Sequence, residues 1–244
     1  TRMAESDKKI AGVTAAMPSG TGMEIFARSY PERYYDVGIA EQHAVTMSTG
    51  LARGGMKPVC AIYSTFLQRA YDQVIHDAAI QNLDLTIAVD RAGIVGNDGE
   101  THQGLFDYSF LRPVPNLVMM AVRAAEQMQH MLYTAVNHEG PAVLRYPRGS
   151  AAGDYKPLKV EELKSLEIGK AEELIKIEAE MDLTILAVGS TVYPAQKAAE
   201  ILNNNGYKTA LVDARFIKPL DEEMITRALK NSENIITVEE QVLA

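Results

Sequence analysis

Short apolar runs alternate with longer amphipathic segments in the first part of the chain. Four runs rich in apolar and β-branched residues are typical of buried strands: 57–63, 85–90, 117–122 and 142–146. Three segments between them keep apolar residues at helical spacing: 41–53, 65–81 and 123–137. This βαβ rhythm predicts an α/β fold built on a doubly wound, mostly parallel sheet.

The pattern changes after residue 146. Two prolines and two glycines lie within 147–157, and a charged segment follows them. We therefore expect a first domain at 1–150, a linker at 151–182 and a second, smaller α/β domain at 183–244. Its expected strands are 183–189, 208–213 and 234–239, and its expected helices are 193–204 and 221–230. Because the chain stops directly after a strand, we expect this second domain to be truncated.

Composition limits the classes of protein that fit the chain. Hydrophobic residues make up 47% and charged residues 23% of the 244 positions, which is the balance of a globular protein. The net charge of −8 argues against a nucleic-acid partner, and the sequence has no apolar run long enough to span a membrane. The single cysteine, Cys60, fits a buried position in a protein of a reducing compartment. No metal-binding spacing of His or Cys occurs in the sequence.

Polar loops after the expected strands are the candidate functional segments, because open parallel sheets bind ligands at the carboxyl ends of their strands. In the first, an apolar bend at 37–40 brings Glu41 to the start of a helix. A carboxylate there can be only a favourable first-turn charge, worth about 0.3–1 kcal/mol. The apolar surroundings also suit a carboxyl group that transfers protons.

In the second segment, Tyr63, Phe66 and Arg69 recur every third residue. By itself this pattern favours an amphipathic helix with two core aromatic residues and a solvated arginine. The functional alternative is an aromatic platform for a flat heterocycle, with a guanidinium nearby for an anion.

The third segment is a long loop, 90–104, that contains four glycines and the titratable residues Arg91, Asp98 and His102. Its apolar flanks favour a functional loop over a disordered one. The glycine spacing matches neither a P-loop nor a dinucleotide-binding fingerprint. Beyond it, Arg145 and Arg148 lie at the carboxyl end of another expected strand, where one could bind a phosphate and the other could form a structural ion pair.

Five segments occur together in this order: IAEQHAVT, YSTFLQRAYDQV, DRAGIVGNDGETHQG, RYPRG and FIKPLD. In this combination, and over nearly its whole length, the chain resembles the 1-deoxy-D-xylulose-5-phosphate synthases of the transketolase superfamily. The Ala-Glu-Gln turn is shared with transketolases and with pyruvate dehydrogenase β-subunits. The combination of QRAYDQ, DRAG and THQG is more specific to the synthases.

The resemblance implies a pyrimidine-binding domain followed by part of a transketolase C-terminal domain, with thiamine diphosphate (thiamine pyrophosphate) as cofactor. Glu41 then corresponds to the catalytic glutamate that hydrogen-bonds N1′ of the cofactor's pyrimidine. Tyr63 and Phe66 correspond to the aromatic residues beside that ring, and Ile39 and Met17 to residues that line the cofactor.

The same resemblance implies a set of substrate-binding residues. Arg69, Arg91 and Arg148 correspond to basic groups around the substrate, of which Arg91 and Arg148 would bind the phosphate of the triose. Asp98 and His102 correspond to polar groups beside the reacting centre, and are expected to act in catalysis as well as in substrate binding.

The implied enzyme is a transferase that joins pyruvate to D-glyceraldehyde 3-phosphate with loss of carbon dioxide, in isoprenoid and thiamine biosynthesis. It would be a homodimer in the bacterial cytoplasm or the plastid stroma. The Gly-Asp-Gly signature of the family's diphosphate and Mg²⁺ site is absent from this sequence. We therefore expect the Mg²⁺ ligands in an N-terminal domain missing from the chain, and no activity from the isolated chain.

Two alternatives remain open. The chain could be a separate β-type subunit of a split transketolase or of a 2-oxo-acid dehydrogenase, and would then need a partner chain. It could also be a non-catalytic dimerising module that retains the site residues.

Overall fold

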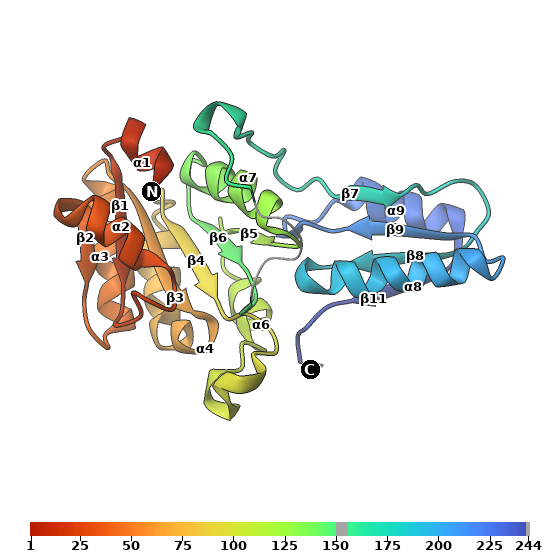
Figure 1. The fold of residues 1–244 in the computed structure, drawn as a ribbon, viewed down its shortest axis with the longest axis horizontal. Coiled ribbons are helices and arrows are strands. Elements are labelled where there is room, and N and C mark those ends of the chain that lie inside the picture. Colours follow the sequence, from red (N-terminus) through yellow and green to blue (C-terminus); the bar gives the residue numbers. More distant parts are fainter. Residues whose placement is uncertain (150–155, 243–244) are drawn as a thin grey trace.

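Within residues 1–149 and 156–242, which the computed structural model describes, the strands form a seven-stranded and a four-stranded sheet (Figure 1). The order in the large sheet is β10-β5-β6-β4-β3-β1-β2, and in the small sheet β11-β8-β9-β7. The strands of the large sheet are β1 (Ile10–Thr14), β2 (Tyr34–Asp36), β3 (Lys57–Tyr63), β4 (Thr86–Asp90), β5 (Val118–Ala121), β6 (Ala142–Arg145) and β10 (Phe216–Lys218). All of its pairings are parallel except that of β10 with β5.

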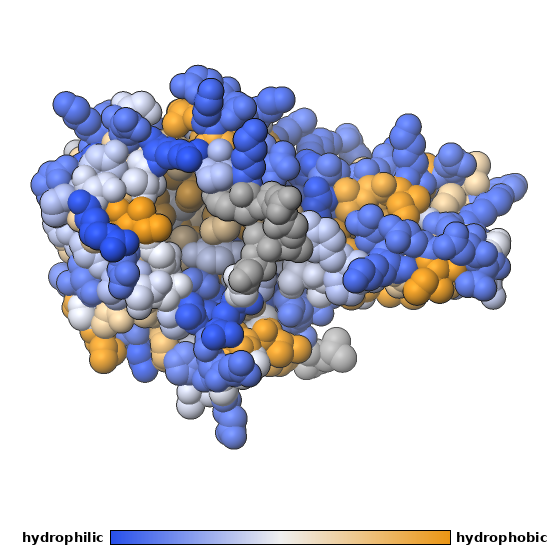
Figure 2. Space-filling model, viewed as in Figure 1, coloured by the Kyte–Doolittle hydropathy of each residue, from blue (hydrophilic) through white to orange (hydrophobic). Residues whose placement is uncertain are grey.

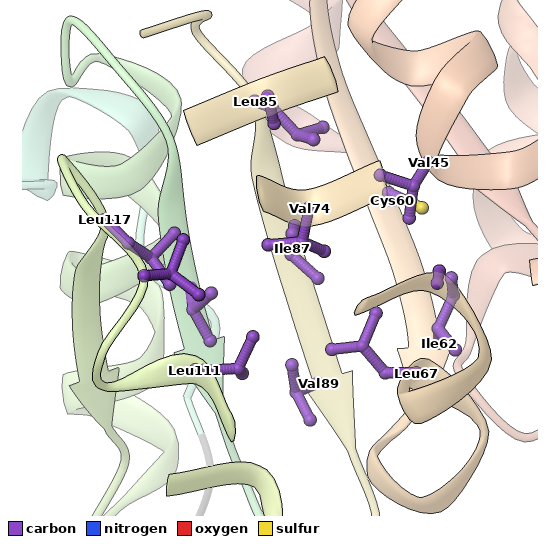
Figure 3. Close-up of a cluster of buried hydrophobic side chains, with 14 of the residues drawn as sticks. Val45, Cys60, Ile62, Leu67, Val74, Leu85, Ile87, Val89, Leu111 and Leu117 are labelled. Carbon is purple, nitrogen blue, oxygen red and sulfur yellow. The ribbon is translucent and has the colours of Figure 1, made fainter. Parts of the chain in front are cut away.

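Helices cover both faces of the large sheet, because successive side chains of a strand point to opposite faces. Met119 of β5 packs in the same buried cluster as Val45, whereas Met120 packs with Met131 on the other face. Figure 3 shows the first of these clusters, which includes the buried Cys60. The helices of this part are α1 (Arg2–Ser6), α2 (Met23–Ser29), α3 (Glu41–Arg53), α4 (Ser64–Leu67), α5 (Tyr71–Gln73), α6 (Asp107–Leu111) and α7 (Ala125–Val136). The predicted α/β class with a largely parallel sheet is confirmed.

The helix expected at 65–81 is not continuous. After α4 it changes to a 3₁₀ turn at Gln68–Ala70, to α5, and then to a π-helical segment at Val74–Ala79. Leu67, Ala70 and Val74 are fully buried, so packing against the sheet determines the winding of this segment. Tertiary contacts override a local helical pattern in this way.

The small sheet consists of β7 (Glu172–Ile175), β8 (Met181–Ala187), β9 (Thr209–Asp213) and β11 (Ser232–Val238). Helices α8 (Val192–Asn204) and α9 (Glu222–Asn231) belong to the same unit. Strand β8 pairs in parallel with β9 and β11, whereas β7 pairs antiparallel with β9.

The segment expected as a linker, 151–182, contains structure of its own. Its first part, 151–155, lies outside the described residues, but its last part includes β7. Between them the chain lies along α7, where the N–H of Leu166 donates to the Thr134 hydroxyl at 2.9 Å. The sequence did not reveal β7, because its four residues, EELI, are half charged.

The second unit is attached to the first by strand β10. Phe216 is fully buried and packs with Val118, Met120 and Leu144 on the α7 face of the large sheet. The sequence did not predict this strand, because it has only three residues. The edge of the large sheet is therefore completed by residues from the second half of the chain.

The face of the molecule in Figure 2 is largely hydrophilic, with separate apolar patches on both units. Among the described residues, none of the helices has the length and apolar character needed to cross a bilayer.

Replacing Phe216 by Ala should lower the free energy of unfolding by about 3–5 kcal/mol, because it leaves a cavity in the cluster that joins the two units. Urea denaturation followed by circular dichroism measures the change. The matched control is Leu229→Ala on α9, whose residue is 65% exposed and whose loss should cost little. Equal effects of the two substitutions would show that β10 does not hold the units together.

Candidate active site

Neighbouring strands of the large sheet end at one edge and deliver the candidate residues there. In the register of the sheet, Tyr63 of β3 lies opposite Asp90 of β4, and Val89 lies opposite Arg145 of β6. The segments that follow these strands contain the aromatic residues, the glycine-rich loop and Arg148. Pairing of the strands therefore brings together groups that are far apart in the sequence.

Glu41 begins α3 and is 2% exposed. Its Oε1 accepts a hydrogen bond from NH1 of Arg69 at 2.8 Å, and this pair joins α3 to the turn after α4. The Arg69 guanidinium also lies 5.0 Å from the centre of the Phe66 ring. A buried carboxylate of this kind is more than a solvated first-turn charge. Arg69, which we expected beside the substrate, is paired with this carboxylate in the structure.

The turn before Glu41 is held by a single carboxylate. Oδ1 of Asp36 accepts hydrogen bonds from the N–H groups of Gly38, at 3.0 Å, and Ala16, at 2.8 Å. Gly38 has a φ of +71°, a conformation that favours glycine. Of the two residues expected to line the cofactor, Met17 is buried in the core cluster, whereas Ile39 is 80% exposed.

Tyr63, Phe66 and His102 form an aromatic group near Glu41. The Tyr63 and Phe66 rings are stacked, with centroids 5.9 Å apart and planes inclined by 18°. His102 lies edge-on to Phe66 at 5.2 Å, and its Nδ1 forms a 2.9 Å hydrogen bond with the Thr101 hydroxyl. Both rings pack against the core cluster while remaining partly exposed, and their role as an aromatic platform stays a prediction.

Two arginines converge on one carboxylate. Nε of Arg91 donates to Oδ2 of Asp98 at 2.8 Å, and Nε of Arg148 lies 2.9 Å from Oδ1 of the same residue. Arg91 is held further by the Tyr63 ring, whose centre is 3.8 Å from its guanidinium, and by the carbonyl of Gly20 at 3.1 Å. The structure thus assembles the arginines and Asp98 into one charged cluster beside the aromatic group.

Arg145 has a different role from Arg148. Its side chain is 2% exposed, and Nε donates to both carboxylate oxygens of Asp107, at 2.9 and 3.0 Å. The Ser64 hydroxyl donates to the same carboxylate at 3.0 Å, and Arg145 also donates to the Tyr108 hydroxyl. Arg145 therefore forms a buried structural ion pair, whereas Arg148 pairs with Asp98 through a side chain that is 41% exposed.

Asp90 was not among the residues expected in the site. It is buried at the end of β4, and its Oδ1 accepts a 2.6 Å hydrogen bond from the N–H of Arg91. Burial raises the pKa of its carboxyl group to about 6, although the neighbouring Arg91 acts in the opposite direction. In the sequence, the signal that could have placed Asp90 in the site was its position at the end of an apolar strand.

The charged cluster opens into a cleft of about 680 Å³. Its lining includes Asp90, Arg91 and Arg148 from the first unit and Ser190 and Tyr193 from the second. Among the described residues, no group of three or more acidic, His or Cys side chains could hold a metal ion.

Two protein-family models match the chain. The model described as "Transketolase, pyrimidine binding domain" covers residues 1–153, and "Transketolase, C-terminal domain" covers residues 170–244. The chain belongs to the transketolase pyrimidine-binding domain family. The resemblance inferred from the sequence motifs is thereby confirmed at the level of the family.

Curated relatives of this transketolase-family chain are named 1-deoxy-D-xylulose-5-phosphate synthase. The chain is 55% identical to the one from Halothermothrix orenii over 99% of its length, and 54% identical to the one from Desulforudis audaxviator over its full length. It spans 37% of the length of each of these relatives.

Solved structures agree on the fold. A chain described as "Split gene transketolase, inactive beta4 tetramer" matches with a TM-score of 0.84 and 27% identity, over 98% of this chain and 76% of that one. The transketolase from Campylobacter jejuni matches with a TM-score of 0.80 and 20% identity, over 97% of this chain and 40% of that one. At 20% identity the second match supports the architecture alone.

The residues of the site fit one part of the family's cofactor. A buried carboxylate and a pair of stacked rings suit an aminopyrimidine, which offers a ring nitrogen and a flat face. The described residues provide no cluster of acidic, His or Cys side chains for the Mg²⁺ that accompanies the cofactor.

The titration of Asp90 predicts a pH-dependent stability. Unfolded aspartate has a pKa of about 3.9, so between about pH 4 and pH 6 the folded protein retains a proton that the unfolded chain has lost. This contribution to stability is therefore lost as the pH rises through that window. Asp90→Asn removes the titrating carboxyl group. Between pH 4 and pH 7, the free energy of unfolding of the variant should therefore rise by about 1–3 kcal/mol relative to that of the parent.

Urea denaturation of both proteins across this pH range measures the difference. Asp72→Asn, which removes an exposed carboxylate, is the matched control. A difference between Asp90→Asn and the parent that stays constant with pH would mean that Asp90 is ionised throughout the range.

Proposed function

We propose that this chain is the pyrimidine-binding and acceptor-binding part of a thiamine-diphosphate-dependent 1-deoxy-D-xylulose-5-phosphate synthase. The reaction joins pyruvate to D-glyceraldehyde 3-phosphate and releases carbon dioxide, for isoprenoid and thiamine biosynthesis. The observation that carries the proposal is the convergence of Arg91 and Arg148 on Asp98 beside Tyr63 and Phe66. The names of relatives at 54–55% identity support the same reaction.

Glu41 and Arg69 supply the proposed contact with the cofactor. Glu41 would hydrogen-bond the ring nitrogen N1′ of the pyrimidine, because it is the first residue of α3 and its carboxylate is buried. Arg69 balances its charge from one side and leaves the other oxygen, Oε2, available to the ring. When bound, the cofactor supplies the electron sink for decarboxylation. Tyr63 and Phe66 would hold the pyrimidine ring in place.

Arg91 and Arg148 would bind the phosphate of the acceptor. A guanidinium binds phosphate through charge-assisted hydrogen bonds, and two of them suit a dianion in a protein of net charge −8. In this structure Asp98 occupies both arginines, so phosphate binding requires the Asp98 carboxylate to give up at least one of them. His102 and Asp98 would then contact the reacting end of the acceptor.

The proposal also includes parts that this chain does not supply. Mg²⁺ and the diphosphate of the cofactor would be bound by a domain outside residues 1–244, so the isolated chain should bind thiamine diphosphate weakly and be inactive. The complete enzyme would be a homodimer in the cytoplasm of a bacterium, in keeping with the bacterial sources of the relatives.

The match to the chain of a split-gene transketolase favours a second candidate, a separate subunit that works with a partner chain. The chain covers 76% of that protein but 37% of the synthases. Its identity of 27% to the split transketolase is half its identity to the synthases, which favours the first proposal. The sequence of the encoding gene distinguishes a fragment from a separate subunit.

Replacing Arg91 or Arg148 by Ala in the full-length protein should weaken binding of glyceraldehyde 3-phosphate about ten- to a hundred-fold, the loss typical of a charge-assisted contact. Pyruvate lacks a phosphate, so its KM should change little. Steady-state kinetics in which each substrate is varied separately measure both effects.

Arg28→Ala, which removes an exposed arginine of α2, is the control. Melting temperatures of all three variants show whether the fold is intact. Equal increases in both KM values would defeat the phosphate assignment and favour a purely structural role for the cluster.

A further inference from the structure

The loop at 91–104 carries three of the proposed substrate residues and is closed at its base by a pair of hydrogen bonds. Gly93 and Gly104 each donate to the carbonyl oxygen of the other at 2.8 Å. The base is narrow, because a Cβ added to Gly104 would lie 2.3 Å from the Arg91 carbonyl oxygen. This two-residue bridge therefore fixes the distance between the two ends of the loop.

Residues 240–242, which follow β11, lie against this base. A Cβ added to Gly93 would lie 2.5 Å from a carboxylate oxygen of Glu240. The N–H of Val242 donates to the carbonyl of Leu105 at 3.3 Å, directly after the bridge. The Gln241 amide donates to the hydroxyl of Ser109 in α6 at 2.6 Å. In Figure 1 the chain leaves β11 on the side of α6.

Glu240 is also connected to the small sheet. Its carboxylate accepts a hydrogen bond from the hydroxyl of Ser190, in the turn Gly189–Thr191 that follows β8. The Thr191 hydroxyl donates to the carbonyl of Val238 at 2.8 Å, which fixes the same turn to the end of β11. Ser190 lines the 680 Å³ cleft together with Arg91 and Arg148. One carboxylate thus links the second unit, the loop base and the wall of the cleft.

We propose that Glu240 is a positioning residue that, with Ser190, holds the base of the 91–104 loop so that Arg91 and Asp98 are in place for a phosphorylated acceptor. The inference rests on the proposed function for the identity of the acceptor. A loop that is already ordered loses less conformational entropy when the ligand binds. The second α/β unit therefore contributes to acceptor affinity through the loop, although neither Arg91 nor Asp98 belongs to it.

Hydrogen exchange of this chain tests the contact without any enzyme assay. Glu240→Ala should raise the exchange rates of the Gly93 and Gly104 amides about tenfold, since it removes the carboxylate that packs on Gly93 and is held by Ser190, and the bridge should then open more often. Glu240→Gln keeps an acceptor oxygen for Ser190 and should stay closer to the parent. The matched control is Glu233→Ala, at an exposed position of β11. Unchanged exchange in Glu240→Ala overturns the proposal.

Kinetics of the full-length protein test the consequence for the acceptor. Glu240→Ala should raise the KM for glyceraldehyde 3-phosphate about three- to tenfold and leave the KM for pyruvate near its parent value. Equal rises for both substrates overturn the positioning role. If the parent forms no product, the proposed function fails, whereas the exchange rates still decide whether Glu240 holds the loop.

Discussion

The hydrogen bonds between β3, β4 and β6 determine where the groups of the site begin. Their parallel register places Tyr63 beside Asp90 and Val89 beside Arg145, at the edge where loops leave the sheet. A slip of one residue would turn each of these side chains to the opposite face. The ion pair of Arg145 with Asp107, buried at this edge, connects β6 to α6 and, through Ser64, to the start of α4. The strand pairings and this buried ion pair thus fix the scaffold from which the loops of the site leave.

On this scaffold, each arginine of the site is paired with a carboxylate. The side chains differ in exposure: Arg91 is 16% exposed, whereas Arg69 and Arg148 are 49% and 41% exposed. Arg91 is held on several sides by Tyr63, Gly20 and Asp98, so it has a fixed position. Arg148 has a more exposed side chain, so solvent screens its ion pair with Asp98 more and breaking that pair costs less. On Asp98, therefore, one guanidinium that is held in place, that of Arg91, meets a more exposed one, that of Arg148.

The sequence predicted most of the central part of the fold. The expected strands at 57–63 and 85–90 agree with β3 and β4 because such continuous apolar runs are typical of strands buried on both faces. Strands β2 and β10, with three residues each, and the half-charged β7 carry no comparable signal. Strand β10 moreover pairs with a strand about a hundred residues earlier in the chain, which no local pattern indicates.

The candidate residues could be named from their types and motifs, but their partners could not. The pairing of Glu41 with Arg69 and the sharing of Asp98 by two arginines depend on side-chain directions that arise only when the sheet forms. The raised pKa of Asp90 results from burial, which a terminal strand residue does not reveal in the sequence. The contact of Glu240 with the loop base joins positions nearly 150 residues apart, and only the packing of the two units produces it.

The most direct test of the account is to supply the full-length protein with pyruvate, D-glyceraldehyde 3-phosphate, thiamine diphosphate and Mg²⁺. Released carbon dioxide and the sugar phosphate that forms are then measured together. The account predicts equal amounts of carbon dioxide and 1-deoxy-D-xylulose 5-phosphate. Transfer of a two-carbon unit between sugar phosphates without release of carbon dioxide, or the absence of any product, would contradict it.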